Sequence, residues 1–548
     1  MKKFKTLYIF LLSGLLLFAG CDDDILDLKN PNNYDTGTFF QTEEELKLAT
    51  NAVYGGLYFG GLWTREYFFI FDLIGNDAST ATALQGELAE FAKYTYDAAH
   101  GQINVYWRSL YRIVLRANLV IDKGNEFLEN NGPNEDVNRY IGEAKFLRAY
   151  AYSELVTQFG RVPLKTSLAD LDVILTPRAP EAEIWDLVHQ DLDDAISVLP
   201  ASYDDPDVGR ATKGAAIALK GKALLTQKNY SQAATEFAKL EGMGYDLVPG
   251  DQWYDNWSDE DAKENNIESV FEVQIKRIPG TSTWFMFGGQ EDWGKGAAHT
   301  GRPMEYGFND WQNVYISPAA VQGFVYEDPE GNEYIDPRAE NTFYGRYGLG
   351  DSTWCDLAGF TPEEIQELPV DDVEKSLGNG VLLYNLEKRG YRFKKYQNYE
   401  KIFKESKPES NNNSKVIRYA DVLLMRAEAL IMDNKVSDGM ALINRVRERV
   451  GAFTITGISG QPEAMEVLKR ERHLELCGEQ VRWRDLVRWG DAKSALNKEL
   501  NAQYNVDENG NQLSDKVFFQ DKHVLFPIPQ SEKDVNTVIL DDIANDWN

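Results

Sequence analysis

The sequence predicts a mainly α-helical fold, in which tetratricopeptide-like helix pairs form a scaffold and a loop-rich, partly β segment is inserted into it. Apolar residues recur at helical spacing from about residue 41 to 240 and again after residue 416. Between these stretches glycine, asparagine, aspartate and aromatic residues become frequent, and the helical spacing fades. One helix pair cannot cover its own apolar face, so such pairs must stack into a continuous body.

Residues 1–20 have the layout of a secretory signal peptide. Three lysines precede an apolar run from Leu7 to about Phe18, and two small residues follow the run. This run is shorter than the roughly 20 residues that a membrane-spanning helix needs. We therefore expect it to be a cleaved signal and not a membrane anchor.

A cysteine stands where the mature chain would begin. Residues 17–21 (Leu-Phe-Ala-Gly-Cys) resemble a bacterial lipobox, whose cysteine is lipidated, and we expect Cys21 to be the attachment point for acyl chains such as palmitate. Stable anchoring takes more than one acyl chain, which a lipoprotein cysteine carries. The alternative is an ordinary export signal with an incidental cysteine. The interpretation we favour is a lipoprotein whose body is held at the membrane only through its lipid.

Residues 21–40 are predicted to be an acidic N-terminal tether. Three aspartates, Asp22 to Asp24, directly follow the cysteine, and residues 29–33 (Lys-Asn-Pro-Asn-Asn) are typical of turns. An acidic run at this place resembles the surface-export signal of Bacteroidetes lipoproteins, which indicates the cell exterior. The alternative is a solvated acidic leader without a sorting role.

Residues 41–244 are predicted to form an N-terminal helical, tetratricopeptide-like scaffold. Thr42 and Glu45 have the spacing of a capping box at a helix start. A further helix is expected over residues 141–159, and Gly160 ends it.

Two stretches carry the repeat signal. Ala233 and Phe237, which follow a turn, match the second helix of a tetratricopeptide unit. Helix pairs return at 416–450, within a C-terminal helical region that we place at residues 411–548. The spacing is irregular, so the repeats are degenerate. Residues 526–529 (Phe-Pro-Ile-Pro) cannot be helical and are expected to pack the C-terminal tail on the body.

Residues 245–410 are predicted to be a loop-rich, variable region. Residues 268–274 alternate in polarity as a strand does, and helical spacing is otherwise weak. Loops that a rigid scaffold positions are where binding residues concentrate. We therefore expect this region to hold the ligand.

The acidic composition limits the classes of molecule that the protein is expected to bind. The formal net charge of −30 repels nucleic acid and anionic lipid headgroups, so neither is expected as a general partner. Neutral ligands are expected to be preferred over polyanionic ones. Apart from Cys21 the chain has only Cys355 and Cys477, which could pair but do not form a disulfide framework.

The segment 471–489 is dense in arginine, glutamate and aspartate. Three of its glutamates fall on one helical face, and Arg482 lies within reach of Glu479 or Asp485. We interpret the segment as an ion-paired helix packed on the scaffold and not as a catalytic site.

No cofactor or metal motif is recognised. The five histidines are scattered, without the spacing of a zinc protease. Residues 505–510 begin like a calcium loop, but position twelve is Lys516 where a glutamate would be needed. A structural calcium ion that carboxylates of other loops would hold is the alternative.

Segments spread over nearly the whole chain carry a family resemblance. They are Trp107-x₃-Tyr111-x₆-Asn118, 142–149 (GEAKFLRA), 159–164 (FGRVPL), Asp191-Leu192-x₂-Ala195, 336–338 (DPR), 424–429 (LMRAEA), 471–489 (ERHLELCGEQVRWRDLVRW) and 526–529 (FPIP) with Glu532. Together, behind a lipobox, they resemble the SusD/RagB family of outer-membrane nutrient-binding lipoproteins of Bacteroidetes.

The resemblance implies a SusD-like fold without catalysis. Proteins of this family sit over a SusC-like TonB-dependent transporter in the outer membrane and capture nutrient, usually a glycan, at the cell surface. We expect the same partner and role here. A peptide or other nutrient, a protein-interaction scaffold without a small ligand, and a surface glycoside hydrolase are the alternatives.

Sugar rings stack their C–H faces on aromatic side chains, while their hydroxyl groups bond to amides and carboxylates. Aromatic residues beside such groups are therefore the candidate ligand contacts. They fall into two clusters: Trp63, Tyr67, Asn76 and Asp77, and then Trp284, Trp293, Tyr306 and Trp311. We expect a few members of this set to form the binding platform.

Overall fold

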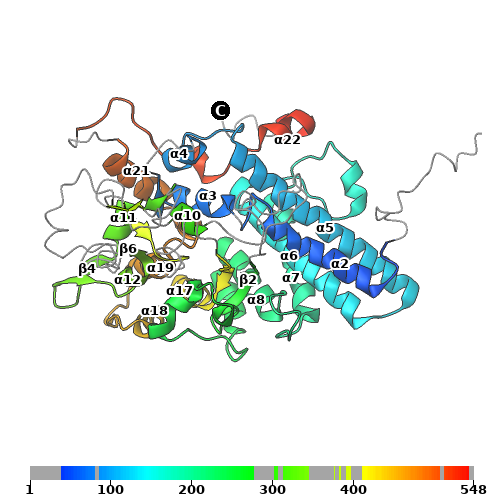
Figure 1. The fold of residues 1–548 in the computed structure, drawn as a ribbon, viewed down its shortest axis with the longest axis horizontal. Coiled ribbons are helices and arrows are strands. Elements are labelled where there is room, and N and C mark those ends of the chain that lie inside the picture. The colour runs from blue at the N-terminus through cyan, green and yellow to red at the C-terminus, as the bar shows by residue number, and fades with distance from the viewer. Residues whose placement is uncertain are drawn as a thin grey trace, which may run out of the picture.

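The computed structural model describes residues 39–63, 65–80, 86–276, 302–306, 313–344, 375–376, 382–383, 391–396, 410–505 and 511–541. The predicted signal peptide and nearly all of the predicted tether lie outside these ranges. The described part is mostly helical, as predicted, and long helices run side by side along one end of the molecule (Figure 1). None of the helices in these ranges is long and apolar enough to cross a bilayer.

The N-terminal scaffold is a series of helices in which successive members contact each other. It consists of α2 (Glu43–Tyr54), α5 (Gly101–Asn131), α6 (Glu135–Phe159), α7 (Glu181–Val198), α8 (Lys213–Thr226) and α9 (Tyr230–Ala238), with α3 (Glu66–Ile74) and α4 (Gly86–Lys93) beside them. From α5 onward each helix packs on the next one, and α2 packs on both α5 and α6. This is the stacked arrangement that the sequence predicts.

The predicted helix ends are confirmed. The backbone N–H of Glu45 donates to the Thr42 hydroxyl at 3.3 Å, and the Glu45 carboxylate accepts from the backbone N–H of Thr42 at 2.9 Å. The helix expected over 141–159 does end at Gly160, which has a φ of +68° that favours glycine. It begins earlier than expected, because the Asn134 side chain caps it by accepting from the N–H of Val137.

The repeat signal corresponds to close packing of α8 on α9. Phe237 is buried against α8, and a Cβ atom on Gly221 would lie only 2.5 Å from its ring. Glycine at this position therefore lets the two helices approach closely. Ala233, one turn before Phe237, is also fully buried.

The C-terminal helices continue the same stack. They are α17 (Tyr419–Met432), α18 (Val436–Arg449), α19 (Gln461–Leu476), α20 (Arg482–Trp489), α21 (Ala492–Gln503) and α22 (Gln530–Val535). Helix α17 packs on α9 as well as on α18 and α19, although the whole loop-rich region separates α9 from α17 in the sequence. The loop-rich region is thus an insertion into a continuous helical stack.

A two-stranded antiparallel ladder closes the base of this insertion. Strand β2 (Ser269–Val273), where a strand was predicted, pairs with β10 (Ser414–Arg418), which leads directly into α17. The two ends of the insertion are therefore joined by hydrogen bonds where they leave and re-enter the stack.

The other described parts of the insertion are short. The antiparallel strand pairs are β1 (Ala78–Ser79) with β3 (Tyr315–Ile316), β4 (Val325–Glu327) with β5 (Glu333–Ile335), β6 (Phe343–Tyr344) with β9 (Arg392–Phe393), and β7 (Lys375–Ser376) with β8 (Leu382–Leu383). The short helices are α10 (Arg302–Tyr306), α11 (Pro318–Gln322) and α12 (Ala339–Thr342). Because β1 precedes α5 in the chain, its pairing with β3 attaches the insertion to the N-terminal region.

The C-terminal tail packs on the body as expected. The N–H of Phe526 donates to the carbonyl of Gln158 at 2.6 Å, and the Phe526 ring contacts the rings of Phe71 and Phe159. The tail therefore covers the end of α6 and joins the main apolar core.

We predict that Phe237→Ala lowers the free energy of unfolding by about 3–5 kcal/mol, because it leaves a cavity at the α8–α9 contact. Urea unfolding followed by circular dichroism measures this change. Gln232→Ala, on the exposed face of the same helix, is the matched control and should have little effect. Equal destabilisation by both variants would contradict the packing role of Phe237.

Candidate functional site

A cleft of about 680 Å³ lies between the C-terminal helices and the inserted region. Residues of α19, α20 and α21 form one wall, residues of α11 and β4 form the other, and Asp77 contributes to the floor. These elements gather at the end of the molecule opposite the long N-terminal helices (Figure 1). A ligand in this cleft would touch the helical stack and the insertion at once.

The walls combine aromatic and polar groups. Tyr326 and Trp489 are half-buried, and the indole N–H of Trp489 has no hydrogen-bond acceptor among the described residues. The exposed side chains of Glu466, Arg470 and Lys498 line the same space. Aromatic surface beside hydrogen-bonding groups is the combination that sugar binding requires.

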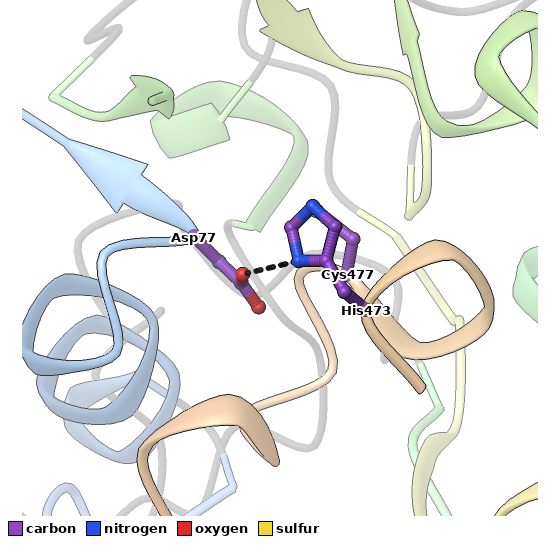
Figure 2. Close-up of side chains that lie close together, drawn as sticks. All are labelled: Asp77, His473 and Cys477. Carbon is purple, nitrogen blue, oxygen red and sulfur yellow. Dashed lines mark ion pairs between the residues drawn. The ribbon is translucent and has the colours of Figure 1, made fainter. Parts of the chain in front are cut away.

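The floor brings together three metal-binding types of side chain. Asp77 comes from the turn before β1, while His473 and Cys477 come from the C-terminal end of α19 (Figure 2). One donor atom from each side chain lies within 4.8 Å of the other two. His473 Nδ1 is 3.7 Å from Asp77 Oδ1, and the other Asp77 oxygen accepts from the N–H of Gly478 at 3.1 Å.

Burial determines the protonation of the three side chains at the floor of the cleft, Asp77, His473 and Cys477. It raises the pKa of Asp77 to about 6, although Arg482 acts in the opposite direction. Burial, together with the charge of Arg482, lowers the pKa of His473 to about 4. Burial also raises the pKa of the Cys477 thiol well above its ordinary value. Near pH 7 the floor thus holds a neutral imidazole and a protonated thiol beside a carboxylate.

The three residues do not form a catalytic relay. In a Cys–His–Asp enzyme one ring nitrogen faces the nucleophile and the other faces the carboxylate. Here His473 Nε2 lies 3.1 Å from the carbonyl of Ala320, so only Nδ1 faces Asp77. The ring therefore cannot transfer a proton between the thiol and the carboxylate.

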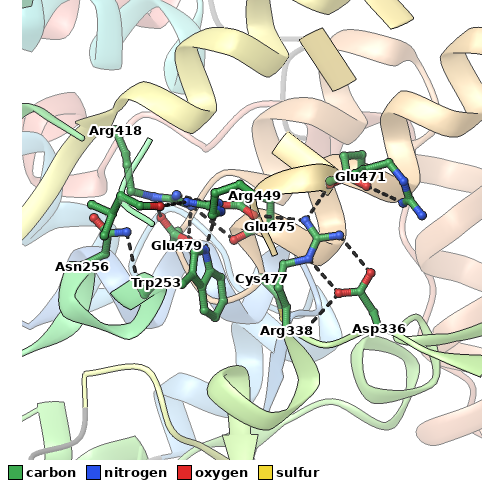
Figure 3. A network of polar contacts seen from close by, with 12 residues as sticks. Trp253, Asn256, Asp336, Arg338, Arg418, Arg449, Glu471, Glu475, Cys477 and Glu479 are labelled. Carbon is green, nitrogen blue, oxygen red and sulfur yellow. Dashed lines mark hydrogen bonds and ion pairs between the residues drawn. The ribbon is translucent and has the colours of Figure 1, made fainter. Parts of the chain in front are cut away.

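A buried ion-pair network surrounds Glu471 and Glu475 of α19, the helix that also lines the cleft (Figure 3). Arg338 bonds to Asp336 at 2.7 Å and to Glu471 at 2.6 Å. Glu475 accepts from Arg338 at 3.1 Å, from Arg418 at 2.6 Å and from Arg449 at 2.5 Å.

The network spans several regions of the chain. Arg418 also bonds to Glu479 at 2.9 Å, and Arg447 of α18 bonds to Glu471 at 2.8 Å. Glu268, just before β2, accepts from Arg449 at 3.1 Å. Glu471 and Glu475 of α19 are thus structural, as predicted. Glu479 joins the same network but lies beyond the end of α19, so the three glutamates do not share one helical face as was predicted.

The prediction that Arg482 pairs with Glu479 or Asp485 is wrong. Arg482 bonds to Glu499 of α21 at 2.7 Å, and Asp485 pairs with Arg472 at 2.6 Å. The prediction assumed one continuous helix, whereas α19 ends at Leu476 and α20 begins at Arg482. The break turns Arg482 toward α21.

Three of the predicted platform aromatics are core residues in the structure. Trp63, Tyr67 and Tyr306 are 4%, 3% and 0% exposed. The Trp63 indole donates to the Tyr150 hydroxyl at 2.9 Å, and the Tyr306 hydroxyl donates to Asp72 at 2.8 Å. Residues 67–74 of α3 are buried on every side, so rings next to them pack inward and present no face to a sugar.

Asn76 and Asp77 lie beside the cleft rather than on an open surface. Asn76 donates to Glu499 at 2.6 Å and is 9% exposed, while Asp77 lines the cleft floor. Trp284, Trp293 and Trp311 lie outside the described residues, so their place in the platform stays a prediction. Cys355 lies outside them too, while Cys477 is a free, buried cysteine in the structure.

Neither His473 nor Cys477 was predicted to belong to a site. Their spacing of four residues at a helix end was the only local signal. Asp77, which completes the cluster, lies almost 400 residues earlier in the chain. Direct packing of α3 on α20 and the hydrogen bond from Gly478 to Asp77 bring these parts together in the folded chain.

Two family models match the chain. One, described as the SusD family, matches residues 297–542, and the other, described as starch-binding associating with outer membrane, matches residues 24–225. A SusD-like protein from Formosa agariphila is 27% identical over 536 residues, which cover 94% of this chain and 96% of the relative. A SusD-like protein from Bacteroides ovatus is 24% identical over 514 residues, covering 88% and 82%.

Solved structures share the fold. A SusD superfamily protein from Bacteroides vulgatus superposes with a TM-score of 0.71 at 24% identity, covering 92% of this chain and 99% of that protein. A laminarin-binding SusD-like protein superposes with a TM-score of 0.69 at 25% identity, covering 89% and 96%. These superpositions confirm the predicted mainly α-helical, SusD-like fold.

The ion-pair network should contribute to the free energy of unfolding, and Glu475 is its central carboxylate. Glu475→Gln leaves three buried arginines short of negative charge and should lower the free energy of unfolding by about 3–5 kcal/mol at pH 7. Burial alone would raise the pKa of Glu475, but Arg449, Arg418 and Arg338 hold it well below its ordinary value. The contribution of this carboxylate is therefore complete above about pH 4.5 and is lost as the pH falls through its folded pKa.

Urea unfolding between pH 3 and pH 7 measures both effects. The gap between the wild type and Glu475→Gln should narrow as the pH falls below about 4.5. Glu466→Gln, at an exposed position of the same helix, is the control and should change little at any pH. A gap that stays constant down to pH 3 would show that Glu475 does not stabilise the fold through its charge.

Proposed function

The chain belongs to the SusD family, and we propose that it captures an oligosaccharide or polysaccharide at the cell surface and delivers it to a SusC-like TonB-dependent outer-membrane transporter. The family matches at both ends of the chain carry this proposal. Members of the family are carbohydrate-binding proteins and not enzymes, and this chain is likewise a binding protein.

Two similarities support a glycan as the ligand. The chain matches a family model described as starch-binding, and a structural neighbour at 25% identity binds laminarin. The cleft adds a physical argument, because half-buried aromatic rings and exposed polar side chains line one space. The strongly negative net charge favours neutral sugars over sulfated or uronic-acid polymers.

The lipid anchor explains how moderate affinity would suffice. Acyl chains on Cys21 would hold the body at the outer membrane, and the tether of residues 21–40 would keep it close to the transporter. Because the tether would keep the protein close to the transporter, the effective concentration of bound sugar at the pore would be high. Each individual binding site can therefore release its sugar readily.

We predict that the purified protein binds at least one neutral glycan, soluble starch or laminarin, without releasing reducing ends. Replacing Trp284, Trp293 and Trp311 together by alanine should weaken that binding about 10- to 1,000-fold, because each stacked ring contributes about 0.5–1.5 kcal/mol. Affinity electrophoresis and calorimetry measure the binding, and sulfated carrageenan serves as the anionic comparison.

Phe518→Ala removes an aromatic ring that is 45% exposed elsewhere on the surface and should leave the affinity unchanged. Unaltered binding by the triple variant would favour a site at the cleft of Trp489 and Tyr326. Absence of binding to every neutral glycan would favour a protein-interaction scaffold, and release of reducing ends would mean a hydrolase.

The anchor can be tested separately. Cys21→Ser should abolish metabolic labelling with a palmitate analogue and shift the protein from the outer-membrane fraction to the soluble fraction. Cys355→Ser removes a different thiol and should leave both properties unchanged. Surface proteolysis of intact cells then reports on orientation: wild-type protein that is shielded from protease would contradict exposure at the exterior.

A further inference from the structure

We propose that Asp77, His473 and Cys477 form a binding site for a divalent transition metal ion, with Zn²⁺ as the expected occupant. One donor atom from each of the three side chains lies within 4.8 Å of the other two, and His473 Nδ1 faces Asp77 Oδ1 at 3.7 Å (Figure 2). They come from two parts of the chain that only the folded structure brings together. The proposal is independent of the glycan-binding role.

The imidazole is oriented as in metal sites. Histidine ligands almost always donate their second ring N–H to a carbonyl or carboxylate, which fixes the tautomer. His473 Nε2 lies 3.1 Å from the Ala320 carbonyl oxygen, which can only accept a hydrogen bond, so Nε2 carries the proton. The lone pair of Nδ1 therefore points toward Asp77.

Two buried acceptors face each other without a donor between them. Asp77 Oδ1 and His473 Nδ1 have no hydrogen-bond partner among the described residues, and the Asp77 side chain is 2% exposed. The carboxylate is held in place because its second oxygen accepts from Gly478. Buried polar atoms without partners are costly, and a cation between these two would satisfy both.

The distances suit a small tetrahedral ion. Zn–N and Zn–O bonds of about 2.0–2.1 Å and a Zn–S bond of about 2.3 Å place neighbouring donors roughly 3.3–3.6 Å apart. The Asp77–His473 pair is already at 3.7 Å. Cys477 directly follows the last residue of α19, so a rotation of its side chain can bring the sulfur closer without moving the helix.

Nearby cations are already neutralised. Arg482 Nε is 3.9 Å from Asp77 Oδ1, but its guanidinium bonds to Glu499 at 2.7 Å. The ammonium of Lys395 bonds to Glu479 at 2.9 Å and to the Cys477 carbonyl at 3.0 Å. The local charge therefore does not prevent a divalent ion from binding to a carboxylate and a thiolate.

The donor set selects the type of metal. Thiolate and imidazole ligands favour Zn²⁺ and similar ions over Ca²⁺ and Mg²⁺, which prefer oxygen. On binding, the Cys477 thiol loses its proton to solvent and the sulfur bonds to the metal. All three residues line the cleft, which offers an entry path and a fourth position for water.

The test uses the purified full chain in detergent, freed of metal with a chelator and kept reduced with a phosphine. Co²⁺ alone is titrated in, and the near-ultraviolet thiolate-to-cobalt charge-transfer band is recorded. Zn²⁺ alone is then titrated in to displace it, and calorimetry gives the stoichiometry. We expect one site per chain, a cobalt band that zinc abolishes, and a melting temperature that rises with zinc and falls again with chelator.

Variants identify the ligands. Cys477→Ala should remove the charge-transfer band, and both it and His473→Gln should weaken zinc binding at least about 100-fold, since even residues that only support metal ligands change affinity about 10–100-fold. Cys355→Ala is the matched control and should retain the band. Circular dichroism and melting without metal show that each variant is folded.

Three results would overturn the proposal: a folded wild type that gives no thiolate–cobalt band, a band that survives in Cys477→Ala, or a band lost in Cys355→Ala. Calcium binding of equal affinity would also contradict it, because the sulfur would then contribute nothing.

Discussion

The structure depends on three glutamates: Glu471 and Glu475 on α19, and Glu479 in the segment between α19 and α20. Their arginine partners come from α18, from the last residue of β10 and from the inserted region. Buried carboxylates are stable only when positive charges and donors surround them, so every partner must be in place for the others to be neutralised. The position of α19, and with it the cleft floor, is therefore fixed only when the insertion has docked on the helical stack.

The helical part of the fold could be predicted because its signals are local. The capping pair Thr42 and Glu45, the terminating Gly160, and the pair Ala233 and Phe237 each act within a few residues. The packing of α17 on α9 had no such signal, since the whole inserted region separates the two helices. The strand pairs of the insertion, apart from β2, are too short to show alternating polarity.

A site residue could be predicted only where its residue type and its local sequence both indicate its place in the folded protein. Aromatic residues were chosen for their chemistry, but Tyr67 lies in α3 and Trp63 just before it, and this almost entirely apolar helix is buried in the core. Asp77 was chosen as a sugar contact and does line the cleft. Its partners His473 and Cys477 were not found, because tertiary structure alone relates them to Asp77.

Different parts of the molecule provide stability and ligand specificity: the helical stack stabilises the fold, and the loops of the insertion can vary. The helical stack is continuous through the α9–α17 contact, and the β2–β10 ladder closes the insertion at its base. The distal loops of the insertion can therefore differ in length and sequence without opening the stack, as long as Arg338, Asp336 and Glu268 keep their places in the network. One wall of the cleft belongs to the C-terminal helices and the other to the insertion. A ligand held between them would thus be bound by a fixed surface on one side and selected by a variable one on the other.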